Sequence, residues 1–404
     1  MSPGGIARGA RRGLPALLVI GTCCFHPLAT AGVVHTVTVH DGRLRVDGIP
    51  FYVKGIGYNA TSIGSDQQDA DAAQYDVPRM AQMNANDVVT YIANRFEWGG
   101  TEYTGKLDLQ DAVSNACDDA GLFTSVGFWS PIYIDYTSGA VRTQWGNFYK
   151  EMVNRYQNRS STLMYVIGNE VLNNLPDDTQ RNAYADWVEE LVQWTHLNDP
   201  NHPVAYADAG SGQLARLASR APSLDIYGTN WYEFETATVL GAYLDAIESD
   251  WPGVAVFLHE YGSDSYNHAT GGEDETMQAG RVRTLVQAVY EASADPHFIG
   301  GAYFEFTDEW KLVNGSGTQD PGNSYGWQPK SPFDHYADED FWGIARAVNS
   351  GDAENRVLKS AYQALQEMYA IPEPAAAALA AAGAALLALL RRHRRERHAE
   401  AARR

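Results

Sequence analysis

The hydrophobic pattern between the two ends of the chain alternates short apolar runs with longer amphipathic stretches. Eight runs are nearly continuous, as expected of parallel strands buried on both faces; they span 51–59, 87–92, 122–129, 163–170, 204–210, 224–232, 254–261 and 299–310. Stretches with helical spacing intervene, for example at 108–121, 181–198 and 275–294. This repeat predicts an α/β fold, a TIM (β/α)8 barrel.

The segment before the first run predicts a short N-terminal β-hairpin. Alternating apolar residues surround Asp41-Gly42 and Asp47-Gly48, and both pairs are hairpin turn signals. A doubly wound open sheet is the rival architecture, but it usually carries a glycine-rich phosphate turn after its first strand. The chain has no GxGxxG or P-loop motif, which favours the barrel.

Residues 1–31 predict a secretory signal peptide. Three arginines precede the short apolar run LPALLVIGTCCF, and Ala29-Thr30-Ala31 is a typical cleavage site. A membrane anchor is the alternative, but the run is too short to span comfortably. We therefore expect export, with residues 32–370 as the mature domain.

Residues 371–404 predict a second sorting element. Pro372-Glu373-Pro374 precedes 375–390, which holds only Ala, Leu and Gly, and an arginine-rich tail follows. These three parts resemble, in their order, the PEP-CTERM sorting signals of Gram-negative bacteria. The resemblance implies transient inner-membrane anchoring by a short transmembrane segment, cleavage by an exosortase, and a place at the cell surface or in the extracellular matrix. An alanine-rich helix with a basic end is the alternative.

The charge balance narrows the possible partners. The chain has 50 acidic and 30 basic residues, and ten of the basic residues lie in the two terminal elements, so the domain itself is strongly acidic. Such a domain repels nucleic acid and anionic membranes and suits a neutral polysaccharide or oligosaccharide. Only Cys117 remains once the signal peptide is removed, and no CxxC or histidine-rich spacing occurs. The sequence therefore predicts no intrachain disulfide, metal or cofactor.

Polar and aromatic residues gather where the predicted strands end. In a TIM barrel the active site lies at these carboxyl ends. The fourth run ends on Asn169-Glu170 and the seventh carries Glu260. The ends of the other runs supply further candidate substrate-binding residues, namely Tyr58, Trp129, Asn230, Tyr232 and Trp310.

Glu170 and Glu260 have the arrangement that glycoside cleavage requires. The fourth and seventh strands of a small barrel face each other. A protonated carboxyl and an ionised carboxylate about 5–5.5 Å apart cleave a glycosidic bond with retention of configuration. Burial near a second carboxylate would raise the pKa of Glu170 and keep it protonated. The alternative is a pair of salt-bridged surface residues; two glutamates that each follow an apolar strand favour the catalytic interpretation.

Residues 45–345 resemble the large clan of (β/α)8 retaining β-glycosidases, through the motifs GNEV and HEYG. Within the clan, FYVKGIGY, TLMYVIGNEVLNN, DIYGTNWYEF and VFLHEYG are similar to β-1,3-glucanosyltransferases, and DEWK is similar to the β-galactosidase and β-glucuronidase family. The resemblance implies that Glu170 is the acid/base and Glu260 the nucleophile. It also implies that Asn169 bonds the sugar 2-hydroxyl, that Tyr232 holds Glu260, and that Trp310 forms a platform under the sugar.

Each implied binding role has a structural alternative. Tyr232 and Trp310 could be core aromatics, and Asn169 could cap the following turn. The sequence also departs from the clan on the second strand, where an arginine is usual: Val89 occupies that place, and Arg95 follows a few residues later.

Residues 311–342 form a long loop rich in Gly, Pro, Asp and aromatic residues. Long loops on the barrel face usually shape binding. A calcium-stiffened surface loop is the alternative, and its candidate ligands are Asp334, Asp338, Glu339 and Asp340.

The sequence thus predicts an exported retaining β-glycoside hydrolase that acts on β-glucan or a related polysaccharide by double displacement. A β-glucan transglycosylase is one alternative. A non-catalytic carbohydrate-binding surface protein on the same barrel is another, motivated by Val89 in place of arginine. The paired glutamate motifs argue against it, because a binding protein needs no acid and nucleophile.

Overall fold

The computed structural model describes Ala29 and residues 32–59, 62–63, 69–91, 93, 96–98, 101–103, 105–310, 319, 335–336 and 338–372. All of the expected signal peptide except Ala29, and the expected sorting element after Pro372, lie outside these residues. Among the residues that are described, no helix has both the length and the apolar character needed to cross a bilayer. The candidate membrane segment at 375–390 lies outside them.

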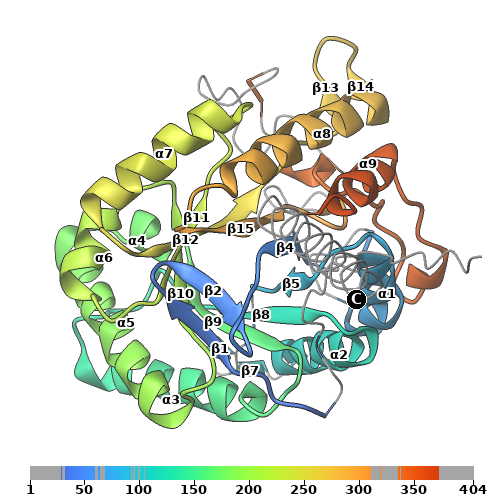
Figure 1. Ribbon diagram of the computed structural model, residues 1–404. Helices are drawn as coiled ribbons and strands as arrows, with labels where there is room; N and C mark the ends of the chain where they lie inside the picture. The colour runs from blue at the N-terminus through green and yellow to red at the C-terminus, as the bar shows by residue number, and fades with distance from the viewer. Residues whose placement is uncertain are drawn as a thin grey trace, which may run out of the picture. The chain divides into compact units, whose positions relative to one another are not determined.

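Eight parallel strands close into a barrel (Figure 1). In chain order they are β4 (Val53–Gly57), β5 (Asp87–Val89), β8 (Phe123–Phe128), β9 (Thr162–Asn169), β10 (Val204–Ala209), β11 (Ile226–Asn230), β12 (Ala255–Tyr261) and β15 (Phe298–Tyr303). Each pairs in parallel with the next, and β15 pairs with β4 to close the barrel. The structure confirms the predicted TIM barrel.

Helices follow the strands and surround the barrel (Figure 1). They are α1 (Ala73–Gln82), α2 (Gly105–Ala120), α3 (Gly139–Tyr156), α5 (Asp178–Asn198), α6 (Leu214–Arg220), α7 (Ala237–Asp250), α8 (Glu275–Ala292) and α9 (Ser360–Tyr369). Short helices are α4 (Val171–Asn174), η1 (Ala70–Ala72), η2 (Glu339–Phe341) and η3 (Ala353–Asn355). Four of the long helices, α3, α5, α7 and α8, have an N-cap residue whose side chain accepts a hydrogen bond from the first turn. These N-cap residues are Ser138, Asp177, Thr236 and Asp274.

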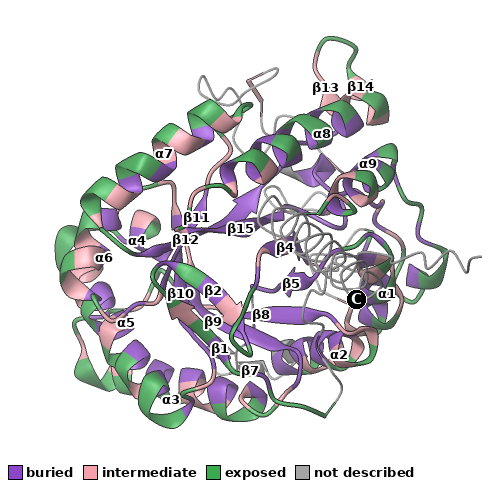
Figure 2. Ribbon diagram, in the orientation of Figure 1, coloured by how far each residue is buried: buried purple, intermediate pink, exposed green. Residues whose placement is uncertain are grey.

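The hydrophobic core has two layers. One layer lies between the strands and the helices, and the other fills the barrel interior with residues such as Val166 and Phe257. Figure 2 shows the strands buried and the outer faces of the helices exposed. Burial on both faces explains why most residues of the strands are apolar.

The N-terminal segment forms a small antiparallel sheet. Its strands are β1 (Val37–His40), β2 (Arg43–Val46) and β3 (Ile49–Pro50). The predicted hairpin is thus present, with a third short strand added. Phe51 packs edge-on against Phe123, the first residue of β8, and the amide of Val37 donates to the carbonyl of Asn201, just before β10. The sheet therefore contacts the N-terminal end of the barrel.

The eighth strand is shorter than predicted. The sequence extended it over 299–310, but β15 ends at Tyr303. The polar residues after it belong to a buried loop, because the carboxylate of Asp308 accepts a 2.6 Å bond from the buried Nζ of Lys359. Two small hairpins were also not predicted; they are β6 (Phe96–Trp98) with β7 (Thr101–Tyr103), and β13 (Tyr266–Asn267) with β14 (Gly272–Glu273).

Candidate active site

The end of β9 makes a sharp turn that presents Asn169 and Glu170. Gly168 has φ +74°, and a Cβ at this position would collide with the hydroxyl of Tyr184, so glycine is required. Glu170 itself is left-handed, with φ +55°, and its amide donates to the carbonyl of Ala207 at 2.9 Å. This turn holds a non-glycine residue in a rare backbone conformation, as functional sites often do.

Asn230, the last residue of β11, connects three of the polar strand ends. Its Nδ2 donates to Oδ1 of Asn169 at 3.0 Å and to Oε1 of Glu170 at 2.7 Å. Its Oδ1 faces Nδ1 of His259 at 3.1 Å. Burial lowers the pKa of His259 to about 3, so the ring is neutral and its Nδ1–H is the donor. Residues from β9, β11 and β12 therefore share one hydrogen-bonded cluster.

Glu260 of β12 lies beside this cluster. Its side chain is buried, and Oε2 accepts a 2.8 Å bond from the hydroxyl of Tyr232. Oε1 lies 3.7 Å from Nδ1 of His259. The strand register places Glu260 opposite Asn230. The structure thus brings together five predicted site residues, which are Asn169, Glu170, Asn230, Tyr232 and Glu260.

The surroundings of the two glutamates shift the pKa values of Glu170 and Tyr232. Burial raises the pKa of Glu170, and the hydrogen bond from Asn230 opposes that rise only in part. Burial and the nearby charge of Glu260 raise the pKa of Tyr232, so Tyr232 remains a neutral hydrogen-bond donor to Glu260. A carboxyl whose pKa is raised in this way can act as a general acid.

Three residues near Glu260 were not predicted, namely Tyr91, Glu305 and Glu309. The ring of Tyr91 packs edge-on against His259, with centroids 5.2 Å apart. Burial raises the pKa of the Tyr91 hydroxyl, and the charges of Glu260, Glu305, Glu309 and Glu170 add to that rise. The Tyr91 hydroxyl thus lies in the field of four carboxylates, and it has no hydrogen-bond partner among the described residues. Tyr91 lies two residues beyond Val89, and the period of a strand could have indicated that both point into the barrel.

The remaining predicted residues are Tyr58, Trp129 and Trp310. Tyr58 is buried in the layer between barrel and helices, where its hydroxyl donates to Asp76 at 3.0 Å. Trp129 is half-buried directly after β8, and Trp310 is half-buried seven residues after β15 ends. Val89 is buried in the barrel interior, and Arg95 lies outside the described residues.

The described part of the chain contains no group of three or more His, Cys, Asp or Glu side chains placed to hold a metal ion. Of the candidate calcium ligands, Asp338 is buried and bonded to Nε2 of His268 at 2.7 Å. Asp334 and the side chain of Glu339 lie outside the described residues.

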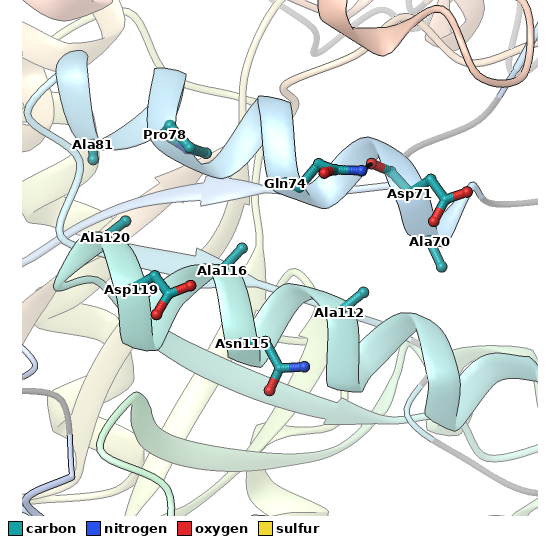
Figure 3. A pocket seen from close by; sticks show the side chains of 10 residues that line it. All are labelled: Ala70, Asp71, Gln74, Pro78, Ala81, Ala112, Asn115, Ala116, Asp119 and Ala120. Atoms are coloured by element: carbon teal, nitrogen blue, oxygen red, sulfur yellow. Dashed lines mark hydrogen bonds between the residues drawn. The ribbon is translucent and has the colours of Figure 1, made fainter.

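A surface groove of about 540 Å³ lies between α1 and α2 (Figure 3). Small and polar side chains line it; they are Ala70, Asp71, Gln74, Pro78, Ala81, Ala112, Asn115, Ala116, Asp119 and Ala120. All of them lie on η1, α1 or α2, outside the barrel, and none follows a strand end. The groove is therefore separate from the glutamate cluster.

A pair of carboxyl groups at one site is what cleavage of a glycosidic bond requires. The sequence profile of the glucanosyltransferase family matches residues 28–320, and the chain belongs to this family. It is 22% identical over 320 residues to the 1,3-beta-glucanosyltransferase gas4 of Schizosaccharomyces pombe, covering 73% of this chain and 63% of that protein. It is 22% identical over 241 residues to Protein EPD1 of Candida maltosa, covering 54% and 41%. The chain thus spans about half the length of these curated relatives.

Solved structures share the fold. A GH2 beta-galacturonidase from Eisenbergiella tayi bound to galacturonate superposes with a TM-score of 0.58 at 16% identity, covering 84% of this chain and 54% of that one. The beta-glucuronidase of Bifidobacterium dentium superposes with a TM-score of 0.59 at 20% identity, covering 84% and 50%. These likenesses concern the barrel.

Proposed function

We propose that the protein is a retaining β-glycoside-cleaving enzyme that acts on β-glucan or a related polysaccharide. One observation carries the proposal: Glu170 and Glu260 lie at one site, because Asn230 bonds both Glu170 and His259, and Oε1 of Glu260 lies 3.7 Å from Nδ1 of His259. Membership of the glucanosyltransferase family agrees with it.

In the proposed reaction, Glu260 attacks the anomeric carbon while Glu170 donates its proton to the leaving oxygen. The glycosidic bond breaks and a glycosyl–Glu260 ester forms. Glu170, now ionised, then takes a proton from an incoming water or sugar hydroxyl, whose oxygen displaces Glu260 from the anomeric carbon. Asn169 binds the sugar 2-hydroxyl, and Tyr232 holds Glu260 in position through its 2.8 Å bond.

Transfer to a sugar acceptor is the second candidate outcome of the same intermediate. The printed name of the gas4 relative, a 1,3-beta-glucanosyltransferase, favours it. We further propose that the enzyme is exported through residues 1–31 and retained at the cell surface by way of residues 371–404. Under this proposal the polysaccharide and an exosortase are its partners.

The decisive experiment compares the protein with its Glu260→Gln variant on β-1,3-, β-1,4- and β-1,6-linked oligosaccharides, with products followed by mass spectrometry. We expect shorter products, longer products or both with the wild type, and a loss of at least about a thousandfold with the variant. Glutamine has the same size and keeps an acceptor for Tyr232, so its circular dichroism and melting temperature serve as the control for folding. Equal turnover by both proteins would refute the role of Glu260. Binding without turnover would support the carbohydrate-binding alternative.

A further inference from the structure

The ring of Trp342 packs against Tyr232, whose hydroxyl donates to Oε2 of Glu260 at 2.8 Å. Trp342 is buried in the interior layer of the core, and its ring centroid lies 4.7 Å from that of Tyr232. It follows the long loop, beyond residue 320, where the match to the family profile ends. Neither the family match nor the pattern of strand ends pointed to this residue. One side chain therefore separates Trp342 from the candidate nucleophile.

Tyr232 needs a support for its ring, because it lies outside the barrel ladder, two residues after β11 ends. The backbone just before it is fixed: the amide of Trp231 donates to the carbonyl of Glu260 at 3.0 Å, and the ring of Trp231 is stacked on Tyr243 at 3.9 Å between centroids. These contacts leave the side-chain torsions of Tyr232 free to turn. In the described part of the chain, the aromatic ring packed against Tyr232 is that of Trp342.

Trp342 is itself held firmly by the barrel. The ring of Phe304, directly after β15, meets it edge-on, with centroids 5.4 Å apart and planes 86° apart. The side-chain amide of Gln278 on α8 donates to the carbonyls of Trp342 and Gly343 at 3.3 and 3.2 Å. A Cβ on Gly343 would lie 1.8 Å from the amide nitrogen of Asp308, so only glycine lets the chain pass this close to the loop after β15. The position of the Trp342 ring is thus fixed on two sides.

The contribution of Trp342 comes from its ring and not from its N–H group. The indole Nε1 is buried and has no hydrogen-bond partner among the described residues. A buried donor without a partner costs free energy, so hydrogen bonding does not explain a tryptophan at this position. The ring contacts with Tyr232 and Phe304 are favourable for aromatic pairs at these distances.

We propose that Trp342 is a positioning residue for the nucleophile: its ring fixes the ring of Tyr232 so that the hydroxyl stays on Oε2 of Glu260. The inference rests on the proposed function. The rate of attack depends steeply on the orientation of the attacking carboxylate, so a displaced Tyr232 hydroxyl slows the reaction. Trp342 acts through Tyr232 alone, and the segment that follows the long loop becomes part of what prepares Glu260 for attack.

The test is a double-mutant cycle with the full-length protein, which compares Trp342→Leu, Tyr232→Phe and the two together. Release of fluoride from the β-glycosyl fluoride of a β-1,3-linked glucose disaccharide gives kcat and KM. We expect Trp342→Leu to lower kcat by about tenfold, with KM changed by less than about twofold. In the Tyr232→Phe background the same substitution should change kcat by less than about twofold, because the hydroxyl that it positions is gone. Trp342→Phe keeps an aromatic ring without the unpartnered N–H and should restore most of the activity.

Trp251→Leu is the matched control, because it makes the same substitution beside a tyrosine at the other end of the barrel. Trp251 lies between α7 and the start of β12, with its ring centroid 6.4 Å from that of Tyr227. Its effect on kcat should be the same with and without Tyr232→Phe. Circular dichroism and melting temperatures compare the folding of all variants, and Trp342→Met replaces Trp342→Leu in the cycle if the latter does not fold.

The outcomes separate the positioning role from the activity itself. Equal losses from Trp342→Leu in both backgrounds would overturn the inference, because Trp342 would then not act through Tyr232. A loss in Trp342→Phe as large as that in Trp342→Leu would also overturn it. If the wild type releases no fluoride, the proposed function fails, and a crystal structure of Trp342→Leu decides the positioning role: displacement of the Tyr232 hydroxyl from Glu260 supports it, and an unchanged bond refutes it.

Discussion

Two carboxylate clusters in this protein are held by different kinds of hydrogen-bond donor. Asp76 of α1 is buried beneath the segment that follows the barrel, where both of its oxygens accept bonds from the guanidinium of Arg356 at 2.9 Å. Glu170 and Glu260 lie at the strand ends, where the amide of Asn230 and the hydroxyl of Tyr232 donate to them. Burial raises the pKa of both Asp76 and Glu170, but the positive charge of Arg356 opposes the rise at Asp76, whereas a neutral amide opposes it at Glu170. The first arrangement serves stability and the second suits proton transfer.

Among these variants, Glu170→Gln should have the largest effect, and this effect should be on activity. Removing the general acid should lower kcat/KM by about 10²–10⁴-fold for oligosaccharides, because the leaving oxygen then departs as an alkoxide. A glycosyl fluoride needs much less protonation and should lose far less. The ratio of the two losses, measured side by side, is the readout. Equal losses on both substrates would contradict an acid role and indicate a general disruption of the site.

Arg356→Met should act on stability alone. It leaves the buried Asp76 with its bonds from Arg79 and Tyr58 but without Arg356, and we expect the free energy of unfolding to fall by about 3 kcal/mol, the lower end for a broken buried pair. Urea denaturation provides the measurement. The matched control is Arg283→Met, because the half-exposed pair of Arg283 with Glu367 should contribute about 1 kcal/mol or less. A similar small loss in both variants would show that burial does not distinguish the two ion pairs.

Tyr232→Phe should reduce activity without unfolding the protein. It removes the donor to Oε2 of Glu260 and leaves the ring packed on Trp342, at 4.7 Å between centroids. A lost hydrogen bond to a charged group corresponds to about 1.5–3 kcal/mol, so kcat should fall by roughly ten- to a hundredfold. Steady-state kinetics with a glycosyl fluoride would measure it. An unchanged kcat would place Tyr232 among the packing residues, as its structural alternative holds.

Asn230→Ala should give the smallest and most specific change. The amide of Asn230 opposes the rise that burial causes in the pKa of Glu170, so its loss should raise that pKa further. The acid must be protonated to react, and the alkaline limb of the kcat/KM profile should therefore move to higher pH. A shift to lower pH would contradict the sign. Asn173→Ala, which removes an amide bonded to Ala209 rather than to Glu170, is a suitable control.

The sequence predicted the barrel because continuous apolar runs carry enough information to locate buried strands. It predicted Asn169, Glu170, Asn230, Tyr232 and Glu260 because each lies within or directly beyond an apolar run. These signals are local in the sequence and do not depend on how distant segments pack. The barrel places the carboxyl ends of its strands at one face, and the structure therefore brings all five residues together.

The residues that sequence reasoning placed differently show what local patterns lack. Tyr58 follows the first strand, but it shares the helix-facing side with Ile56, two residues earlier, so strand parity and not strand position decides its surroundings. Trp310 was assigned to a strand end because the apolar run continues past Tyr303. The end of that strand depends on contacts with distant residues such as Lys359, which the run itself does not encode.

Pro372 lies at the opposite end of the barrel from the glutamate cluster. The amine of Lys54, near the start of β4, donates to the carbonyls of Tyr369 and Ile371 at 2.9 and 3.2 Å, and Tyr290 donates to the carbonyl of Pro372. The chain therefore leaves the domain at the N-terminal end of the strands, whereas Glu170 and Glu260 lie at the opposite end. A label attached at Pro372 would therefore start from the end of the barrel that is remote from the glutamate cluster.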